Sequence, residues 1–110
     1  MLSSDVMRGY NDTIILAILM QGPSYGYEIS KQIKKRSNDI YVMKETTLYS
    51  AFTRLEKKGY VRSFTQDKSE GRRRTYYEVT LEGRAYFEEK CQEWVVTQQV
   101  VNQFIKKGVN

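Results

Sequence analysis

The sequence predicts a mainly α-helical fold that carries one small β-hairpin and ends in a long helix. Apolar residues recur at helical spacing in four segments, and between residues 61 and 79 the spacing changes to a strand-like alternation around a turn. In the last segment the apolar residues continue far beyond what a small core needs. Because the chain has 110 residues, it has room for one domain with a modest core.

The composition favours an anionic partner and excludes several kinds of chemistry. The formal net charge is +5, the pI is about 9.3, and the chain has no histidine and a single cysteine, Cys91. One cysteine excludes an intrachain disulfide and fits a reducing cytoplasm, where we expect the protein to be. Without histidine there is no Ser/His or Cys/His nucleophile and no Cys- and His-built metal site, so we expect neither an enzyme nor a cofactor. The longest apolar run, residues 14–20, is far shorter than the roughly 20 residues that span a bilayer, so we expect no membrane partner.

The first predicted helix spans residues 3–21. Ser3 or Ser4 can cap its start, and Asp5 suits its first turn. Residues 14–20 are apolar all round and should be buried on more than one side, which a second subunit would help to achieve. A milder face suited to an interface precedes them, formed by Val6, Gly9, Tyr10 and Thr13.

The second predicted helix runs from a Ser24 cap to about Ser37 and buries Ile29 and Ile33, which are four residues apart. Its outer side carries Lys31, Lys34, Lys35 and Arg36. Such a run is usually a solvated face, but it also stands where the supporting helix of a helix-turn-helix touches phosphate. Residues 37–39 end the helix, and residues 40–42 are expected to be extended.

The third predicted helix, within residues 44–60, has two different faces. Leu48, Phe52 and Leu55 form an apolar stripe at i, i+4 and i+7. Thr46 or Thr47 can cap the helix, and Gly59 is a typical residue to end it. The other face has almost no acid and carries Thr46, Thr47, Tyr49, Ser50, Thr53, Arg54 and Lys57. By itself this pattern fits a solvated amphipathic helix as well as a DNA-recognition helix.

A β-hairpin is predicted next, with strands at 61–65 and 72–79 and turn residues at 67–71. The basic residues of its tip are Lys68, Arg72, Arg73 and Arg74. Since side chains alternate along a strand, Arg72 and Arg74 share one face and Arg73 lies on the other. At least part of this set must therefore face solvent or a phosphate backbone.

The last predicted helix begins after a Thr80 cap and continues from Leu81 to about Lys107, roughly 40 Å at 1.5 Å per residue. Its apolar seam alternates by four and three and consists of Phe87, Cys91, Trp94, Gln98, Val101 and Ile105. A second row comprises Val96, Val100 and Phe104. So much apolar surface predicts a partner helix, most simply in a symmetric homodimer, with docking back on the same chain as the alternative.

This order of elements is that of a winged helix-turn-helix followed by a dimerisation helix. We assign residues 1–80 to the DNA-binding unit and residues 81–110 to a C-terminal dimerisation helix that packs with the first helix in a single compact unit. In this arrangement the third helix enters the major groove, the hairpin lies along the backbone, and a dimer places two heads about 34 Å apart on a pseudo-palindromic operator of double-stranded DNA. The alternative is a winged helix used only for protein contacts. The expected DNA contacts are Tyr27, Lys44, Thr46, Thr47, Tyr49, Ser50, Thr53, Arg54, Lys68, Arg72, Arg73 and Arg74.

Specific motifs resemble those of the PadR family of transcriptional regulators. They are GYEI at 26–29, TLY at 47–49, RLEKKGYV at 54–61 and EGRRRTYYEVT at 70–80, with Glu82-Gly83 following. The resemblance covers essentially the whole chain, and the single terminal helix is similar to that of the short subfamily. It implies a dimeric DNA-binding regulator that acts as a repressor.

The resemblance also implies a ligand site. In multidrug-sensing members of the short subfamily, a tryptophan of the last helix lies on each side of a pore at the dimer centre, and planar hydrophobic ligands stack between the two rings. Trp94 stands at the matching position, although it is also suited to the dimer seam. Gln98 occupies a place where the drug-binding relative has an acid, and Asp12 offers a nearby carboxylate instead. The residues that match the pore lining are Val6, Gly9, Asp12, Thr13, Trp94, Thr97 and Gln98.

Overall fold

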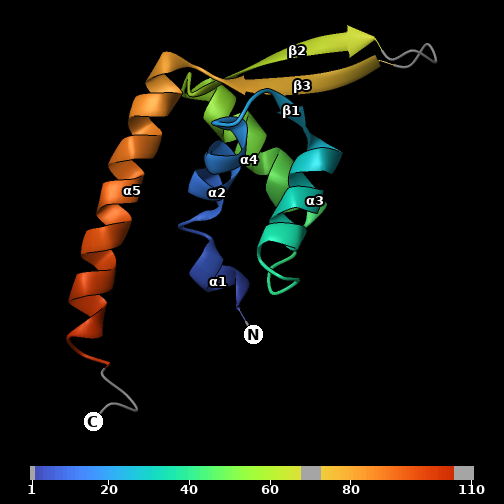
Figure 1. Ribbon diagram of the computed structural model, residues 1–110. Coiled ribbons are helices and arrows are strands. Elements are labelled where there is room, and N and C mark those ends of the chain that lie inside the picture. The colour runs from blue at the N-terminus through green and yellow to red at the C-terminus, as the bar shows by residue number, and fades with distance from the viewer. Residues whose placement is uncertain (1, 68–72, 106–110) are drawn as a thin grey trace.

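The computed structural model describes residues 2–67 and 73–105 and arranges them as helices packed beneath a small sheet (Figure 1). The elements are α1 (Ser4–Met7), α2 (Asn11–Leu19), β1 (Ser24–Tyr25), α3 (Gly26–Arg36), α4 (Glu45–Lys57), β2 (Val61–Asp67), β3 (Arg73–Val79) and α5 (Leu81–Asn102). The sheet lies across one end of α2, α3 and α4, and α5 runs down the side of α2. The predicted fold class, mainly α-helical with a β-hairpin wing, is confirmed.

The core forms where the apolar stripes of α2, α3 and α4 meet the sheet. Phe52 of α4 stacks on Tyr77 of β3, with ring centroids 3.9 Å apart. Full burial of a side chain of this size contributes roughly 1.5–3 kcal/mol. The other core side chains are each less than a tenth exposed and include Ile15, Leu16, Leu19, Ile29, Ile33, Leu48, Leu55 and Val61. The predicted stripes of the second and third helices are therefore confirmed.

The sheet contains a strand that the sequence pattern does not reveal. Its order is β1-β3-β2 and both pairings are antiparallel, with Ser63 opposite Tyr77 in the hairpin. Ser24, expected to cap a helix, instead pairs with Tyr77 across β1 and β3, and α3 begins without a side-chain cap. Two residues are too few to establish an alternating pattern, which is why the sequence alone favoured a cap there.

Besides the cap expected at Ser24, which is wrong, two of the predicted helix caps are confirmed and one more is wrong. Ser3 Oγ accepts a hydrogen bond from the Val6 N–H at the start of α1, and Thr80 Oγ1 accepts one from the Gly83 N–H at the start of α5. Neither Thr46 nor Thr47 caps α4, because the helix already begins at Glu45 and its N-cap residue, Lys44, makes no side-chain hydrogen bond.

The predicted ends of the helices differ in accuracy. Gly59 follows α4 with a φ of +80°, a conformation that favours glycine, so its expected role is confirmed. The single helix expected over residues 3–21 is interrupted by a turn at residues 8–10, where the Tyr10 N–H donates to the Met7 carbonyl. The last helix ends at Asn102 rather than near Lys107.

The two halves of α5 have different surroundings. Its first turns dock on the domain, where Tyr86 stacks on Tyr60 with ring centroids 4.3 Å apart. Farther along, apolar side chains stay uncovered in the single chain, with Val100 52% and Phe104 82% exposed. Docking back on the same chain therefore accounts for the beginning of α5 but not for its second half.

Candidate nucleic-acid interface

The outward side of α4 is a polar face. It lies opposite the buried Leu48, Phe52 and Leu55, and its side chains are short hydroxyls, one tyrosine and one amine. We define the polar face of α4 as the following exposed residues: Lys44, Thr46, Tyr49, Ser50 and Thr53. Thr47, at the edge of this face, is partly buried. Hydroxyl donors and acceptors on the exposed side of a helix are the groups that contact base edges and phosphates in a major groove.

Tyr49 is held in place by its neighbours. Its ring makes an edge contact with Phe52, with centroids 5.4 Å apart, and its Cζ would stand only 2.9 Å from a Cβ atom built on Gly26. The tyrosine remains 44% exposed. The ring therefore fills the space that the missing side chain of Gly26 leaves at the start of α3, while one side of it faces outward.

Arg54 is engaged with α2. Its Nε and Nη2 donate to the two carboxylate oxygens of Asp12, at 3.0 and 2.5 Å. This hydrogen bonding raises the pKa of the Arg54 guanidinium, with partial burial acting in the opposite direction. Sequence reasoning expected Arg54 to contact DNA and Asp12 to offer its carboxylate to a ligand, and it did not anticipate that these two residues pair. The two opposite charges satisfy each other across the α2–α4 contact.

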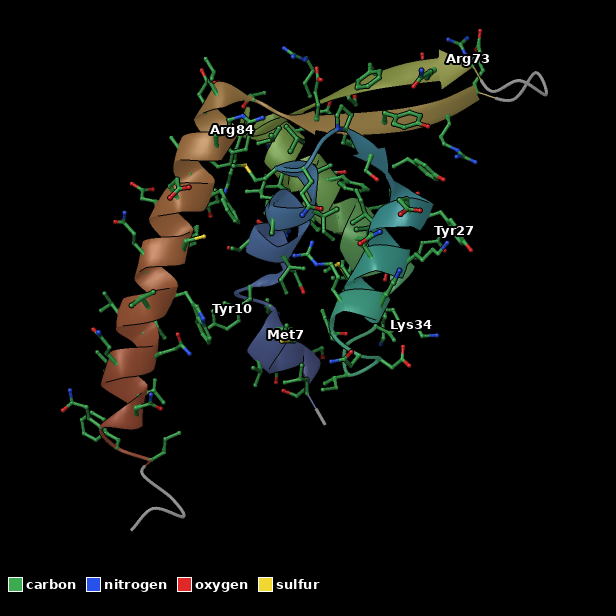
Figure 2. The ribbon with its side chains drawn as sticks, in the orientation of Figure 1. Met7, Tyr10, Tyr27, Lys34, Arg73 and Arg84 are labelled. Atoms are coloured by element: carbon green, nitrogen blue, oxygen red, sulfur yellow. The ribbon has the colours of Figure 1, made fainter. Side chains whose placement is uncertain are left out.

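The α3 helix presents a basic surface beside α4. Tyr27 is 72% exposed, and Figure 2 shows Tyr27 and Lys34 on the same outer side of α3. Lys31, Lys35 and Arg36 are also exposed on this helix. The side chains of the apolar stripe point the other way, so this surface is open to an anionic partner.

The wing carries its arginines on opposite sides. Arg73 is exposed near the far end of the hairpin (Figure 2), where its Nη2 donates to Thr65 Oγ1 at 3.0 Å and its Nε lies 3.5 Å from an Asp67 oxygen. The Arg74 guanidinium lies over the ring of Tyr25, 3.9 Å from its centroid. This cation–π contact holds Arg74 against β1 and leaves Arg73 as the more exposed of the two. Lys68 and Arg72, also expected to contact DNA, lie outside the described residues.

A cavity of about 960 Å³ lies between α5 and the first two helices. Five of the seven expected ligand residues line it, namely Val6, Gly9, Thr13, Trp94 and Thr97. Asp12 and Gln98 do not line it. Trp94 is 44% exposed, so one side of its ring remains available.

Sequence reasoning assigned no ligand role to several other residues that line this cavity. Tyr10 meets Trp94 edge-on at 5.0 Å between centroids, and Met7, Ile14, Cys91 and Val95 complete the apolar wall. The available signal was spacing, because Tyr10 follows Val6 by four residues and Cys91 precedes Trp94 by three, so each pair shares a helical face. Sequence reasoning did place Val6 and Tyr10 on one face and Cys91 and Trp94 on one seam, but it assigned Tyr10 and Cys91 to subunit contacts rather than to a ligand.

In the part of the chain that the structure describes, no group of three or more potential ligand side chains is arranged to hold a metal ion. Within residues 2–67 and 73–105, no helix is both long enough and apolar enough to cross a membrane.

The order of the elements, the projecting hairpin and the exposed face of α4 define a winged helix-turn-helix protein. Comparison with known proteins gives the family. The model of the transcriptional regulator PadR-like family matches residues 15–89. A solved transcriptional regulator from Clostridium thermocellum is 55% identical with a TM-score of 0.87, and the match covers 92% of this chain and 98% of that one.

Two further relatives agree over nearly their whole length. A PadR family transcription regulator from hypervirulent Clostridium difficile R20291 is 41% identical with a TM-score of 0.77, over 87% of this chain and 98% of that one. An uncharacterized protein from Lysinibacillus sphaericus is 41% identical over 106 residues, which are 96% of this chain and 97% of the relative. The chain therefore belongs to the PadR-like family of transcriptional regulators, which regulate through DNA binding and are not enzymes.

Proposed function

We propose that the protein acts in the cytoplasm as a dimeric, sequence-specific repressor that binds a pseudo-palindromic operator and is relieved by a planar hydrophobic ligand. Residues 1–80 form its DNA-binding unit, and residues 81–110 form a dimerisation helix that packs with the first helix in one compact unit. The observation that carries the proposal is the exposed polar face of α4, in a domain whose α3 helix and wing also carry exposed basic side chains.

On this proposal α4 is the recognition helix. Thr46, Thr47, Ser50 and Thr53 offer hydroxyls to base edges, and Lys44 stands at the helix N-terminus within reach of a phosphate. Tyr49 contributes its outward edge to the backbone. Arg54 is left out of the proposed contacts, because its guanidinium is already engaged by Asp12.

The wing and α3 supply the backbone contacts. Arg73 is exposed at the far end of the hairpin, and Arg74 is held beside β1 by Tyr25, so both would meet the duplex on the flank of the groove. Lys68 and Arg72, which lie outside the described residues, belong to the same proposed set. On the other flank, Tyr27 and the lysines of α3 face outward.

The proposed dimer is supported by the uncovered second half of α5. Val96, Val100 and Val101 of α5, together with Phe104 and Ile105 just beyond its end, are each at least 44% exposed in the single chain. Water would contact a continuous apolar surface unless another helix covered it. A second copy offers the same surface, and a two-fold arrangement presents two recognition helices to two half-sites.

The proposed ligand site is the cavity between α5 and the first two helices. Its walls combine Trp94 and Tyr10 with mostly apolar side chains and two threonines, which suits a flat, largely apolar molecule. The charged residues Asp5, Lys90 and Glu93 also line the cavity. In a dimer the two cavities would meet at the centre, with Trp94 from each copy. Gln98, on the same helix as Trp94 and Thr97, belongs to the proposed ligand set only if the second copy brings it to the cavity.

Fluorescence anisotropy with labelled duplex from the region upstream of the protein's own gene tests the DNA proposal. Binding should weaken with salt by close to one decade per decade of salt for each phosphate neutralised. The double variant Thr47→Ala, Tyr49→Ala should abolish sequence-specific binding while the dimer stays folded. If the protein were only a protein-interaction module, binding would change little with salt, and Arg72→Ala together with Arg73→Ala would be tolerated.

A further inference from the structure

Three consecutive residues at the start of α2 contact three different parts of the molecule. Tyr10 meets Trp94 of α5, Asn11 meets Tyr41 in the segment that leads into α4, and Asp12 meets Arg54 of α4. We propose that this segment couples the ligand cavity to the recognition helix, with Asn11 and Asp12 acting as positioning residues for α4. The inference rests on the proposed function, because it assumes that α4 binds DNA and that the cavity holds a ligand.

Tyr10 is the cavity end of the coupling. Its ring lies edge-on to Trp94, at 5.0 Å between centroids and 76° between planes, and both residues line the cavity. Figure 2 shows Tyr10 projecting from the α1–α2 connection toward α5. A flat molecule that stacks on Trp94 must share space with this ring, so occupancy of the cavity acts on the residue immediately before α2.

Asn11 is the buried middle of the coupling. Only 6% of the residue is exposed, and its Oδ1 accepts a hydrogen bond from the Tyr41 hydroxyl at 2.7 Å. Tyr41 is three residues before Lys44, the N-cap of α4, and its own N–H is fixed by Ser37 Oγ at 3.0 Å. Leaving a buried amide without its hydrogen-bond partner costs free energy. A shift of Asn11 therefore tends to move Tyr41 and the segment that leads into α4 with it.

Asp12 contacts the recognition helix directly. Its two oxygens accept from Nε and Nη2 of Arg54, a two-point geometry that fixes the orientation of the guanidinium as well as its distance. The carboxylate is 19% exposed and the guanidinium 44%, so the pair lies at the edge of the core rather than in open solvent. Arg54 is one residue beyond Thr53 of the polar face, so its position and that of the face are linked.

The interruption of the first helix makes the start of α2 a natural point of adjustment. The turn at residues 8–10 separates α1, which carries the cavity residues Val6 and Met7, from α2, which belongs to the core. A Cβ atom built on Gly9 meets nothing within 4 Å, so this residue of the turn is not packed against a neighbour. Displacement of α1 or Tyr10 is thus passed to Asn11 and Asp12 without disturbing the buried turns of α2.

The test uses the chain's only tryptophan, Trp94, as a reporter of the cavity while labelled DNA reports binding. Because coupling between two sites is reciprocal, DNA bound at α4 should change the surroundings of Trp94 with no ligand present. Acrylamide quenching of the wild-type dimer, excited selectively at tryptophan, should change by roughly twofold on saturation with fluorescein-labelled upstream duplex. The anisotropy of the label is read in the same titration.

Asp12→Asn and Arg54→Gln each remove the ion pair, and each should abolish the quenching response while DNA still binds within about tenfold of the wild-type affinity. Combining them should add nothing further. Glu78→Gln is the matched control, because it neutralises a carboxylate that pairs with Arg62 at 2.6 Å inside the wing, away from the cavity. Its quenching response should equal that of the wild type.

The possible results are separable. A quenching response that persists in Asp12→Asn, or that is absent from the wild type although the label shows binding, would overturn the coupling and leave the DNA-binding proposal intact. Loss of the quenching response in both Glu78→Gln and Asp12→Asn would also overturn the coupling, since neutralising a carboxylate far from the cavity would then have the same effect as breaking the Asp12–Arg54 pair. No anisotropy change with the wild type would overturn the proposed function, and the coupling with it.

Discussion

The ring of Tyr49 occupies the space that a side chain on Gly26 would need. A Cβ atom on Gly26 would stand 2.9 Å from Tyr49 Cζ, and closer still to the hydroxyl oxygen. The glycine at the start of α3 therefore determines where a residue of the polar face of α4 lies. The supporting helix and the proposed recognition helix are fitted to each other at this point.

Gly26→Ala should weaken operator binding about tenfold, equivalent to about 1.4 kcal/mol, because the methyl group pushes the Tyr49 ring from its place. Anisotropy with labelled operator duplex measures the loss, and circular dichroism verifies that the helices remain. The control is a double-mutant cycle: in a Tyr49→Ala background, Gly26→Ala should cost almost nothing more. Additive losses would mean that the glycine acts through some other neighbour.

Gly83→Ala should destabilise the fold by about 2–3 kcal/mol. The new methyl group would collide with the Tyr60 carbonyl oxygen, a backbone atom, and would stand 2.7 Å from Val79 Cγ2. Thermal unfolding followed by circular dichroism should show a clearly lower Tm. Gly9→Ala is the comparison, because a Cβ there meets nothing within 4 Å. Equal Tm values for the two variants would show that the close approach of α5 to Tyr60 does not hold in solution.

Thr80 joins the end of the wing to the end of α4. Its hydroxyl donates to the Gly59 carbonyl at 2.6 Å and accepts from the Gly83 N–H at 3.0 Å. Thr80→Ala should therefore cost about 1–2 kcal/mol in urea unfolding, as expected for a lost N-cap. Thr80→Ser keeps the hydroxyl and should lower the free energy of unfolding by less than half as much as Thr80→Ala. If serine were as damaging as alanine, the methyl group rather than the hydrogen bonds would carry the effect.

Much of this fold is encoded locally and is therefore predictable from sequence. The spacing of Leu48, Phe52 and Leu55 identifies the buried side of α4, and the change of period after Tyr60 identifies the hairpin, because each pattern depends only on residues near one another in the chain. The arginine triplet predicted the basic wing for the same reason.

The failures of sequence reasoning come from contacts between distant residues. Arg54 is exposed on α4 as expected, but its ion pair with Asp12, which lies 42 residues earlier, could not be foreseen from a local pattern. Ser24 satisfied the local rules for a helix cap, yet pairing with Tyr77 makes it part of a strand. Tyr10 and Trp94 meet only after α5 has docked. Neither composition nor periodicity shows which distant residues come into contact in the folded chain.

Trp94→Ala should weaken the binding of a flat aromatic probe at least tenfold, because it removes the largest apolar surface of the proposed site. N-phenyl-1-naphthylamine suits the measurement, since its own fluorescence rises in an apolar cavity and replaces the lost tryptophan signal. Trp94→Phe keeps an aromatic face and should lose less. Affinity for the operator in the absence of the probe should remain within about threefold for both variants. Unchanged probe affinity in Trp94→Ala would show that the probe does not bind in this cavity, and the cavity would no longer be the proposed ligand site.

The uncovered second half of α5 leads to a prediction about assembly. Val100→Glu should convert the proposed dimer into single chains at micromolar concentration, because a buried unpaired carboxylate in a helix–helix seam costs several kcal/mol. Sedimentation velocity measures the change. Gln99→Glu introduces the same charge at an adjacent exposed position. Gln99 follows Gln92 by seven residues and Glu88 by eleven, which places it on the polar strip of the helix, so this variant should remain dimeric. A dimer that survives Val100→Glu, or a wild type that sediments as single chains, would mean that two copies do not join through α5.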